Sequence, residues 1–186
     1  MSVDTLAREG VSMEALLAAK EQRAARQADW LAHYQRPVIS LTLVTPGAVK
    51  DSIRYRNMMG VALQACDQML WKHRWQTLDR QVLWLPTGPE ALWCVDHAAS
   101  EIKAFCTDLE HTHPLGRLWD IDVICPKNGL VGRQSMGENQ RRCLLCDEPA
   151  HACARSRRHD TGQVVARVEQ MIDAWSVSYT HLRAHE

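Results

Sequence analysis

The sequence EHTHPLGRLWDIDVI, residues 110–124, contains the pattern that most constrains the fold. If its second half is a β-strand, successive side chains point to opposite faces of a sheet. Asp120 and Asp122 then share one face, and the apolar residues around them share the other. Two convergent carboxylates suit a hard divalent cation, above all Mg²⁺ that holds a polyphosphate. A solvated strand face or a turn is the alternative interpretation of the same pattern.

The segments around this strand predict an α+β fold. Apolar residues recur at helical spacing in residues 12–34, 51–72, 98–109 and 161–175. Further β-rich segments lie at residues 38–45, 81–85, 91–95 and 130–132. A Pro-Thr-Gly-Pro turn joins the segment 81–85 to the segment 91–95, which is typical of a hairpin. Because helices and strands alternate before this hairpin, we expect helices packed on a mixed β-sheet.

The domain is expected to be single and to span residues 1–175. Residues 176–186 continue no helical stripe and resemble a translated adaptor or vector sequence. We therefore assign them to a non-native tail and leave them out of the functional argument.

The first helix has two sides with different expected environments. Its predicted buried stripe consists of Met13, Leu16, Leu17, Ala24, Ala28 and Leu31. Lys20, Arg23 and Arg26 fall largely elsewhere, and we expect them on a solvated face.

Composition argues against several classes of protein. The 22 basic and 22 acidic residues balance, so no global field favours nucleic acid or a membrane surface. No apolar run approaches the roughly 20 residues that span a bilayer, and the N-terminus lacks the features of a secretory signal. Seven cysteines, an odd number, do not indicate a disulfide framework. We therefore expect a cytoplasmic protein with reduced thiols.

Basic residues gather where a polyphosphate could bind. Lys50 stands just before a predicted helix, and both a lysine and a helix N-terminus favour phosphate. Arg117 precedes the two carboxylates. Four more arginines follow Gly132 and could hold phosphates in bidentate fashion: Arg141, Arg142, Arg155 and Arg157. An ordinary turn and simple surface charge are the alternatives.

Cysteines in the same arginine-rich segment have the spacing of metal ligands. The pattern C-x2-C-x6-C-x5-H is formed by Cys143, Cys146, Cys153 and His159. Four such ligands could build a closed tetrahedral Zn²⁺ site with a structural role. His151 is a competing ligand, and three reduced cysteines without metal are the alternative.

His111 and His113 precede the Asp-x-Asp strand. Either could be a general base for a hydroxyl nucleophile, because the pKa of imidazole lies near the working pH. A polar surface position beside proline is the alternative.

The alternation of apolar residues and aspartates at residues 119–123 is typical of the nucleotidyltransferase superfamily, whose two carboxylates hold Mg²⁺ on a triphosphate. The Gly-Ser element that usually precedes this strand is not plainly present. Gly88-Pro89 and Gly116-Arg117 replace it only loosely.

Three segments together resemble one family. They are TPGAVKDS at residues 45–52, the stretch 110–123, and RRCLLC at residues 141–146 followed by CAR at 153–155. They are similar to the apo-citrate lyase phosphoribosyl-dephospho-CoA transferases, also called citrate lyase holo-acyl-carrier-protein synthases. The resemblance covers residues 10–175.

This resemblance implies a reaction and its partners. The prosthetic group would pass from 2′-(5″-triphosphoribosyl)-3′-dephospho-CoA to a serine of the acyl carrier (gamma) subunit of citrate lyase, and diphosphate would leave. The chemistry would be of nucleotidyl-transfer type, with Mg²⁺ on Asp120 and Asp122 and basic residues around the phosphates. Two alternatives stay open: a zinc-stapled Cys/Arg binding module without catalysis, and the equivalent synthase of malonate decarboxylase.

Overall fold

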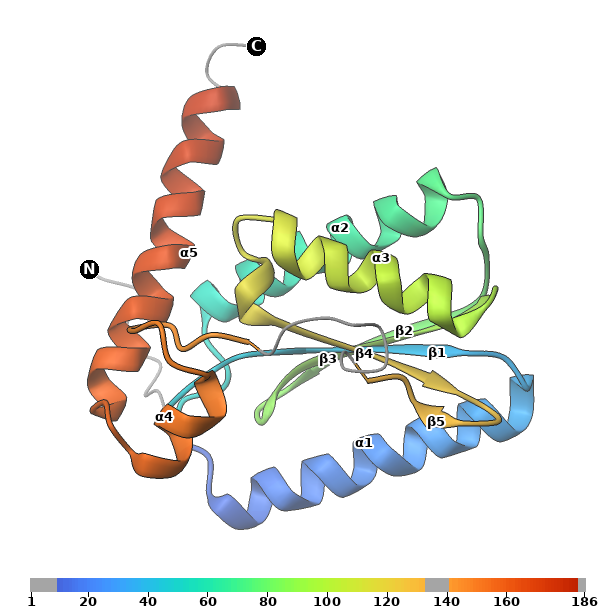
Figure 1. Ribbon diagram of the computed structural model, residues 1–186, viewed down its shortest axis with the longest axis horizontal. Helices are drawn as coiled ribbons and strands as arrows, with labels where there is room; N and C mark the ends of the chain where they lie inside the picture. The colour runs from blue at the N-terminus through green and yellow to red at the C-terminus, as the bar shows by residue number, and fades with distance from the viewer. Residues whose placement is uncertain (1–9, 133–140, 184–186) are drawn as a thin grey trace.

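The computed structural model describes residues 10–132 and 141–183 (Figure 1). Within these residues five strands form one sheet in the order β2-β3-β1-β4-β5. The strands are β1 (Val38–Leu43), β2 (Gln76–Leu85), β3 (Gly88–Asp96), β4 (Trp119–Cys125) and β5 (Gly129–Leu130). The helices are α1 (Met13–Tyr34), α2 (Ile53–Lys72), α3 (Ala99–Thr112), α4 (Ala150–Ser156), α5 (Thr161–Arg183) and the short 3-10 helix η1 (Gly116–Leu118). The predicted single-domain α+β architecture is confirmed.

The strand directions correct the expected mixed sheet. Helix α2 joins β1 to β2 and α3 joins β3 to β4, and each helix connects strands that run in the same direction. In the sheet, however, β3 lies between β2 and β1, and β1 lies between β3 and β4. Every pair of neighbouring strands in the described chain is therefore antiparallel, and the prediction of a mixed sheet was wrong. The order β-α-β-β-α-β is the split βαβ arrangement of ferredoxin-like folds, and it does not by itself identify a nucleotidyltransferase-like fold.

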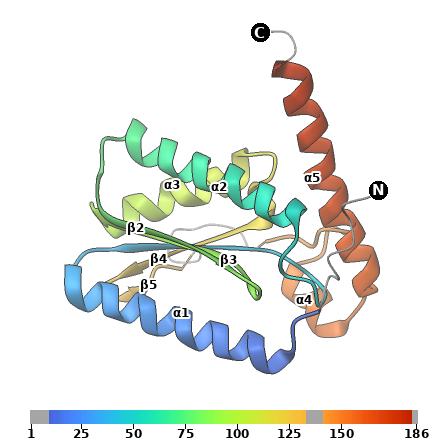
Figure 2. The ribbon, with the colours of Figure 1, turned by 180° about the vertical axis from the view of Figure 1, so that it is seen from behind.

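The helices form layers on both sides of the sheet. Helices α2 and α3 cover one face, and α1 runs along the other (Figure 1). Helix α5 stands at the end of the sheet where β4 begins, and α4 lies beside it, as the view from behind also shows (Figure 2). This end of the molecule therefore brings together the start of β4, the loop after β1 and the C-terminal segment.

Buried apolar residues and aspartates alternate along strand β4, as the sequence predicts. Trp119, Ile121 and Val123 are fully buried in the core beneath α2 and α3. Asp120 is exposed and Asp122 is partly buried on the opposite face. Full burial of each large apolar side chain contributes about 1.5–3 kcal/mol, so the apolar face fixes the register of the strand. The two aspartates consequently project from the opposite face, toward α1.

Helix α1 turns a different side to the sheet than its apolar residues suggest. Ser12 caps the helix as predicted, accepting a hydrogen bond from the backbone N–H of Ala15. None of the residues of α1 is buried, and Met13 is 71% exposed. The prediction of a buried apolar stripe and solvated Arg23 and Arg26 was wrong, since both arginine side chains are half-buried against the sheet. The reason is that the sheet face beneath α1 carries Glu90 and other polar side chains beside the buried apolar residues Val38, Leu92 and Cys94.

Several element boundaries also differ from the prediction. The β2–β3 hairpin is longer than expected, with a bulge between Thr77 and Asp79 and a two-residue connection before Gly88. Helix α3 includes His111, which was expected in a loop. Helix α5 continues past Trp175 to Arg183, although the sequence predicted its end at Trp175.

Candidate functional site

The sheet face beneath α1 gathers polar side chains, and we call it the polar face. Its members are Ser40 and Thr42 of β1, Glu90 of β3, and Asp120 and Asp122 of β4. In the ladder between β1 and β4, Asp122 lies opposite Ser40 and Asp120 lies opposite Thr42. Because side chains alternate along each strand, these groups project from the same face. We refer to Asp120 and Asp122 as the carboxylate pair.

Polar side chains of α1 meet the polar face directly. Gln27 donates a hydrogen bond of 2.8 Å from Nε2 to the hydroxyl of Ser40. Arg23 and Arg26 each lie 3.6 Å from a carboxylate oxygen of Glu90. Burial raises the pKa of Glu90, and the two arginines oppose this shift. These three α1 contacts were not predicted, because the sequence does not show which sheet face α1 covers.

The carboxylate pair is electrostatically coupled. Burial raises the pKa of Asp122, and the nearby charge of Asp120 raises it further. The positive charges of Lys103 and Arg23 act in the opposite direction. A cation bound between the two carboxylates would stabilise their ionised forms. It would thereby offset both the desolvation cost of Asp122 and the repulsion between the two negative charges.

The other side of β4 holds two buried charged residues that the sequence analysis also missed. Lys103 of α3 is almost fully buried and donates a hydrogen bond of 2.9 Å to the backbone oxygen of Ile121. Glu110 of α3 is equally buried and pairs with Arg141. A signal existed, because Glu110 follows Ile102 and Cys106 at steps of four on the apolar stripe of α3. A charged residue on a buried stripe predicts a nearby partner of opposite charge, because burial of an unpaired charge is costly.

The predicted histidines lie on the helical side of the sheet. His113 accepts a hydrogen bond at Nδ1 from the backbone N–H of Leu115, and its ring lies 4.4 Å from that of Trp119. Burial lowers the pKa of His113. His111 is exposed in the last turn of α3. Since Trp119 and the carboxylate pair project from opposite faces of β4, the structure does not bring His113 together with the two aspartates.

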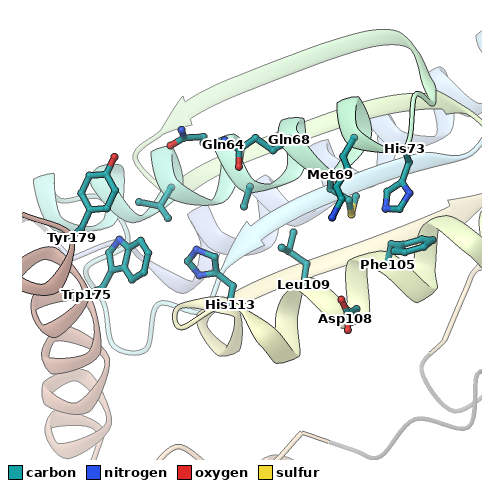
Figure 3. A pocket seen from close by; sticks show the side chains of 13 residues that line it. Gln64, Gln68, Met69, His73, Phe105, Asp108, Leu109, His113, Trp175 and Tyr179 are labelled. Atoms are coloured by element: carbon teal, nitrogen blue, oxygen red, sulfur yellow. The ribbon is translucent and has the colours of Figure 1, made fainter. Parts of the chain in front are cut away.

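His113 instead lines a cavity of about 530 Å³ between α2, α3 and α5. Figure 3 shows His113, Trp175 and Tyr179 at one end of this cavity, and His73 and Phe105 at the other. It is therefore separate from the polar face.

Two of the predicted phosphate-binding arginines hold the backbone together. Arg141 bonds to Glu110 and to the backbone oxygens of Trp119 and Arg117. Arg117 donates two hydrogen bonds, of 3.1 and 2.7 Å, to the backbone oxygen of Arg142. Arg141 and Arg117 thus cross-link the start of β4 to the segment after residue 140. The side chain of Arg142 donates to the backbone oxygen of Asp147, and Arg155 is exposed on α4.

A larger cavity, of about 710 Å³, lies at the end of the sheet, and we call it the end pocket. Arg117 and Arg157 line it together with Pro46 and Gly47, which follow β1. Lys50, in the same loop, donates to the backbone oxygen of Thr45, and burial lowers its pKa. The structure therefore brings Arg117, Arg157 and the predicted phosphate loop to one cavity.

Cys143, Cys153 and His159 line one wall of the end pocket and belong to a group of metal-ligating side chains, the Cys/His cluster. Its members are Cys143, Cys146, Cys153 and His159. Their ligand atoms all lie within 4.8 Å of one another, so they could hold a metal ion such as Zn²⁺. Among the described residues it is the only group of three or more His, Cys, Asp or Glu with this property, and it does not include His151.

Comparison with known proteins decides the family. The sequence matches the family model described as apo-citrate lyase phosphoribosyl-dephospho-CoA transferase over residues 11–175. The chain belongs to this family.

Curated relatives in the transferase family carry the same name. The protein from Shigella flexneri serotype 5b is 37% identical over 163 residues, which are 88% of this chain and 89% of the relative. Proteins from Escherichia coli O1:K1 and O45:K1 are each 36% identical with the same coverage. The resemblance inferred from residues 45–52, 110–123 and 141–155 is thereby confirmed. None of the helices in the part of the chain that the structure describes has the length and apolar character needed to cross a bilayer.

Proposed function

We propose that this protein transfers the phosphoribosyl-dephospho-CoA group from 2′-(5″-triphosphoribosyl)-3′-dephospho-CoA to a serine of the apo acyl carrier subunit of citrate lyase, with release of diphosphate. Membership of the transferase family over residues 11–175 is the observation that carries this proposal. It favours a citrate lyase carrier over that of malonate decarboxylase, and an enzyme over a non-catalytic binding module. Seven free cysteines are consistent with a reducing cytoplasm.

The proposed chemistry is of nucleotidyl-transfer type. The serine oxygen forms a bond to the innermost phosphorus of the triphosphate. The bond from that phosphorus to the bridging oxygen of the leaving diphosphate breaks, and the serine proton passes to a base or to solvent. The protein forms no covalent bond, so positioning and charge neutralisation supply most of the rate enhancement.

The carboxylate pair is the proposed Mg²⁺ site. Carboxylate oxygens are the hard ligands that Mg²⁺ prefers, and the hydroxyls of Ser40 and Thr42 lie opposite them. Magnesium typically takes one or two carboxylates and leaves its other positions to water and substrate phosphates. When bound, the ion would neutralise charge on the triphosphate and its leaving group.

Basic residues reach the donor from two sides in this proposal. Arg23 of α1 lies beside Glu90 and close enough to Asp122 to influence its pKa. Arg117 and Arg157 line the end pocket, and Lys50 is in the neighbouring loop. We therefore propose that the phosphates lie between the polar face and the end pocket. Arg141 acts in this scheme through the backbone that it holds, and His113 is not assigned as the proton acceptor.

The test is intact-mass analysis of the apo carrier subunit after incubation with the donor, Mg²⁺ and this protein. The carrier should gain the mass of the phosphoribosyl-dephospho-CoA group. Asp120→Asn should lower the rate by at least about 100-fold and leave the circular dichroism spectrum unchanged. Asp29→Asn, on the exposed side of α1, is the matched control and should transfer normally. An unmodified carrier in the presence of folded protein and authentic donor would overturn the proposal.

A further inference from the structure

The Cys/His cluster has nearly the spacing that a bound ion requires. In a tetrahedral zinc site with Zn–S of about 2.3 Å, neighbouring sulfur atoms lie about 3.8 Å apart. Here Cys146 Sγ lies 3.4 Å from Cys153 Sγ, and His159 Nε2 lies 3.4 Å from Cys146 Sγ. For these two pairs, shifts of a few tenths of an ångström would give the spacing of a bound ion, and all four ligand atoms lie within 4.8 Å of one another. The sulfur–sulfur distance is far longer than a disulfide bond of about 2.05 Å.

Local structure delivers each ligand to the cluster. Residues 144–148 form a series of bends, and the backbone N–H of Leu145 donates to Cys143 Sγ at 3.4 Å. The hydrogen bond from Cys143 N–H to the backbone oxygen of Glu148 closes the loop of residues 143–148. Donation of an N–H to sulfur favours a thiolate, which is the form that binds metal.

Helix α4 and the residues that follow it supply the remaining two ligands, Cys153 and His159. The helix carries Cys153, and it ends at Arg157 in the left-handed conformation with φ of 51°. The backbone N–H of Arg158 then bonds to the oxygen of Cys153, which turns the chain back and places His159 beside Cys146. Two separate local structures thus converge on one point.

The segment that carries the cluster has little apolar packing to hold it. Among residues 141–160, Cys153 alone is buried. Leu144 packs partly buried against the core, and further attachments are polar, such as the two hydrogen bonds from Arg117 to the backbone oxygen of Arg142. A segment with so few buried apolar groups opens easily unless something cross-links it.

We propose that the Cys/His cluster binds a single structural Zn²⁺ ion, which fixes the wall of the end pocket. Four protein ligands close the coordination shell, so the ion does not take part in the chemistry. The proposal goes beyond the transfer reaction, because zinc binding does not depend on the carboxylate pair.

Metal content of the reduced, purified protein tests this proposal. We expect zinc in a 1:1 ratio, and after substitution with Co²⁺ we expect the visible absorption bands of a tetrahedral thiolate site. His159→Gln and Cys146→Ser should each lower zinc affinity at least about tenfold. The matched controls His151→Gln and Cys125→Ser change the same residue types outside the cluster and should retain zinc. Asp120→Asn should also retain zinc, so failure of the transfer proposal would leave this result intact.

Hydrogen exchange tests the structural role. Removal of zinc with a chelator should increase exchange in residues 141–160 and leave the protection of β1 and β4 unchanged. The proposal would be overturned by folded, reduced protein that binds no zinc, by equal loss of zinc in His151→Gln and His159→Gln, or by a Cys146–Cys153 disulfide in the native protein. Unchanged exchange after zinc removal would overturn the role assigned to the ion.

Discussion

Asp122 and Ser40 lie directly opposite each other in the ladder between β4 and β1, and Ser40 accepts a hydrogen bond of 2.8 Å from Gln27 of α1. One helix side chain thus reaches the sheet beside a partly buried carboxylate. Helix α1 has no buried residue of its own, and its polar side chains contact the polar face. The sheet beneath α1 also carries the fully buried apolar residues Val38, Leu92 and Cys94. On this face Asp120 is exposed and is therefore accessible to a charged ligand.

Asp122→Asn should stabilise the Mg²⁺-free protein near neutral pH and impair transfer. Burial and Asp120 raise the pKa of Asp122 above its unfolded value. Between those two pKa values the folded state binds more protons, so stability falls as pH rises and stays lower above both. The stabilising effect should therefore vanish below a pH of about 4, where the carboxyl group is protonated in both states. Thermal denaturation of both proteins across pH, in the presence of a chelator, measures this difference in stability.

The control for this prediction is Asp29→Asn, which removes an exposed charge from α1 and should change stability little at any pH. Added Mg²⁺ should raise the melting temperature of the unmodified protein more than that of Asp122→Asn. A less stable Asp122→Asn protein at neutral pH would contradict the assignment of Asp122 as a destabilising charge.

Arg23→Ala should weaken donor binding. The side chain lies 3.6 Å from Glu90 and lowers the pKa of Asp122 through its charge, so it stands where phosphates would enter. Loss of one charge-assisted contact of about 1.5–3 kcal/mol corresponds to a rise in KM for the donor of roughly tenfold to hundredfold. Steady-state kinetics with varied donor measure the effect. Lys20→Ala, an exposed cation on the same helix, is the control. A lower melting temperature with an unchanged KM would contradict this prediction and would show that Arg23 only holds α1 against the sheet.

Arg141→Ala should destabilise the fold by about 2–4 kcal/mol. The guanidinium group pairs with buried Glu110 and bonds to the backbone oxygen of Trp119, so its removal leaves a buried carboxylate without that partner. Urea denaturation followed by tryptophan fluorescence measures the change. Arg155→Ala, on an exposed turn of α4, should stay within about 0.5 kcal/mol. Normal stability with lost donor binding would instead support the phosphate-binding role that the sequence suggested for Arg141.

The features predicted correctly from the sequence depend on local periodicity and spacing. The alternation of Asp120 and Asp122 with apolar residues follows from the period of a strand, whatever its neighbours. The spacing of the cysteines likewise identified a group that the structure brings together, with His159 rather than His151.

The features predicted wrongly depend on which segments meet in space. The side of α1 that meets the sheet was misassigned because the polarity of that sheet face comes from β1, β3 and β4 together. The sheet was expected to be mixed because helices and strands alternate before the hairpin, and the sequence does not show that β3 lies between β2 and β1. The pairing of Arg141, a predicted phosphate-binding residue, with Glu110 was missed because the two residues lie 31 positions apart in the chain.

Gly116→Ala should disturb the start of β4, where the carboxylate pair begins. A Cβ atom at this position would lie 2.4 Å from the backbone oxygen of Glu110, so the backbone must move to accept it. We expect a loss of about 2 kcal/mol or more in the free energy of unfolding, together with reduced transfer because Arg117 and Asp120 follow directly. Gly60→Ala in α2 is the control, since nothing lies within 4 Å of its Cβ position. That change should stabilise the protein by about 0.5–1 kcal/mol.

Denaturation and transfer assays on the two glycine variants separate packing from chemistry. If Gly116→Ala retains full stability and full activity, the close approach of Gly116 to the end of α3 does not position the site. If stability falls and the rate per folded molecule stays normal, the contact supports the fold alone. The expected result is a fall in both quantities, because the same backbone that contacts Glu110 leads into Arg117 and then into Asp120.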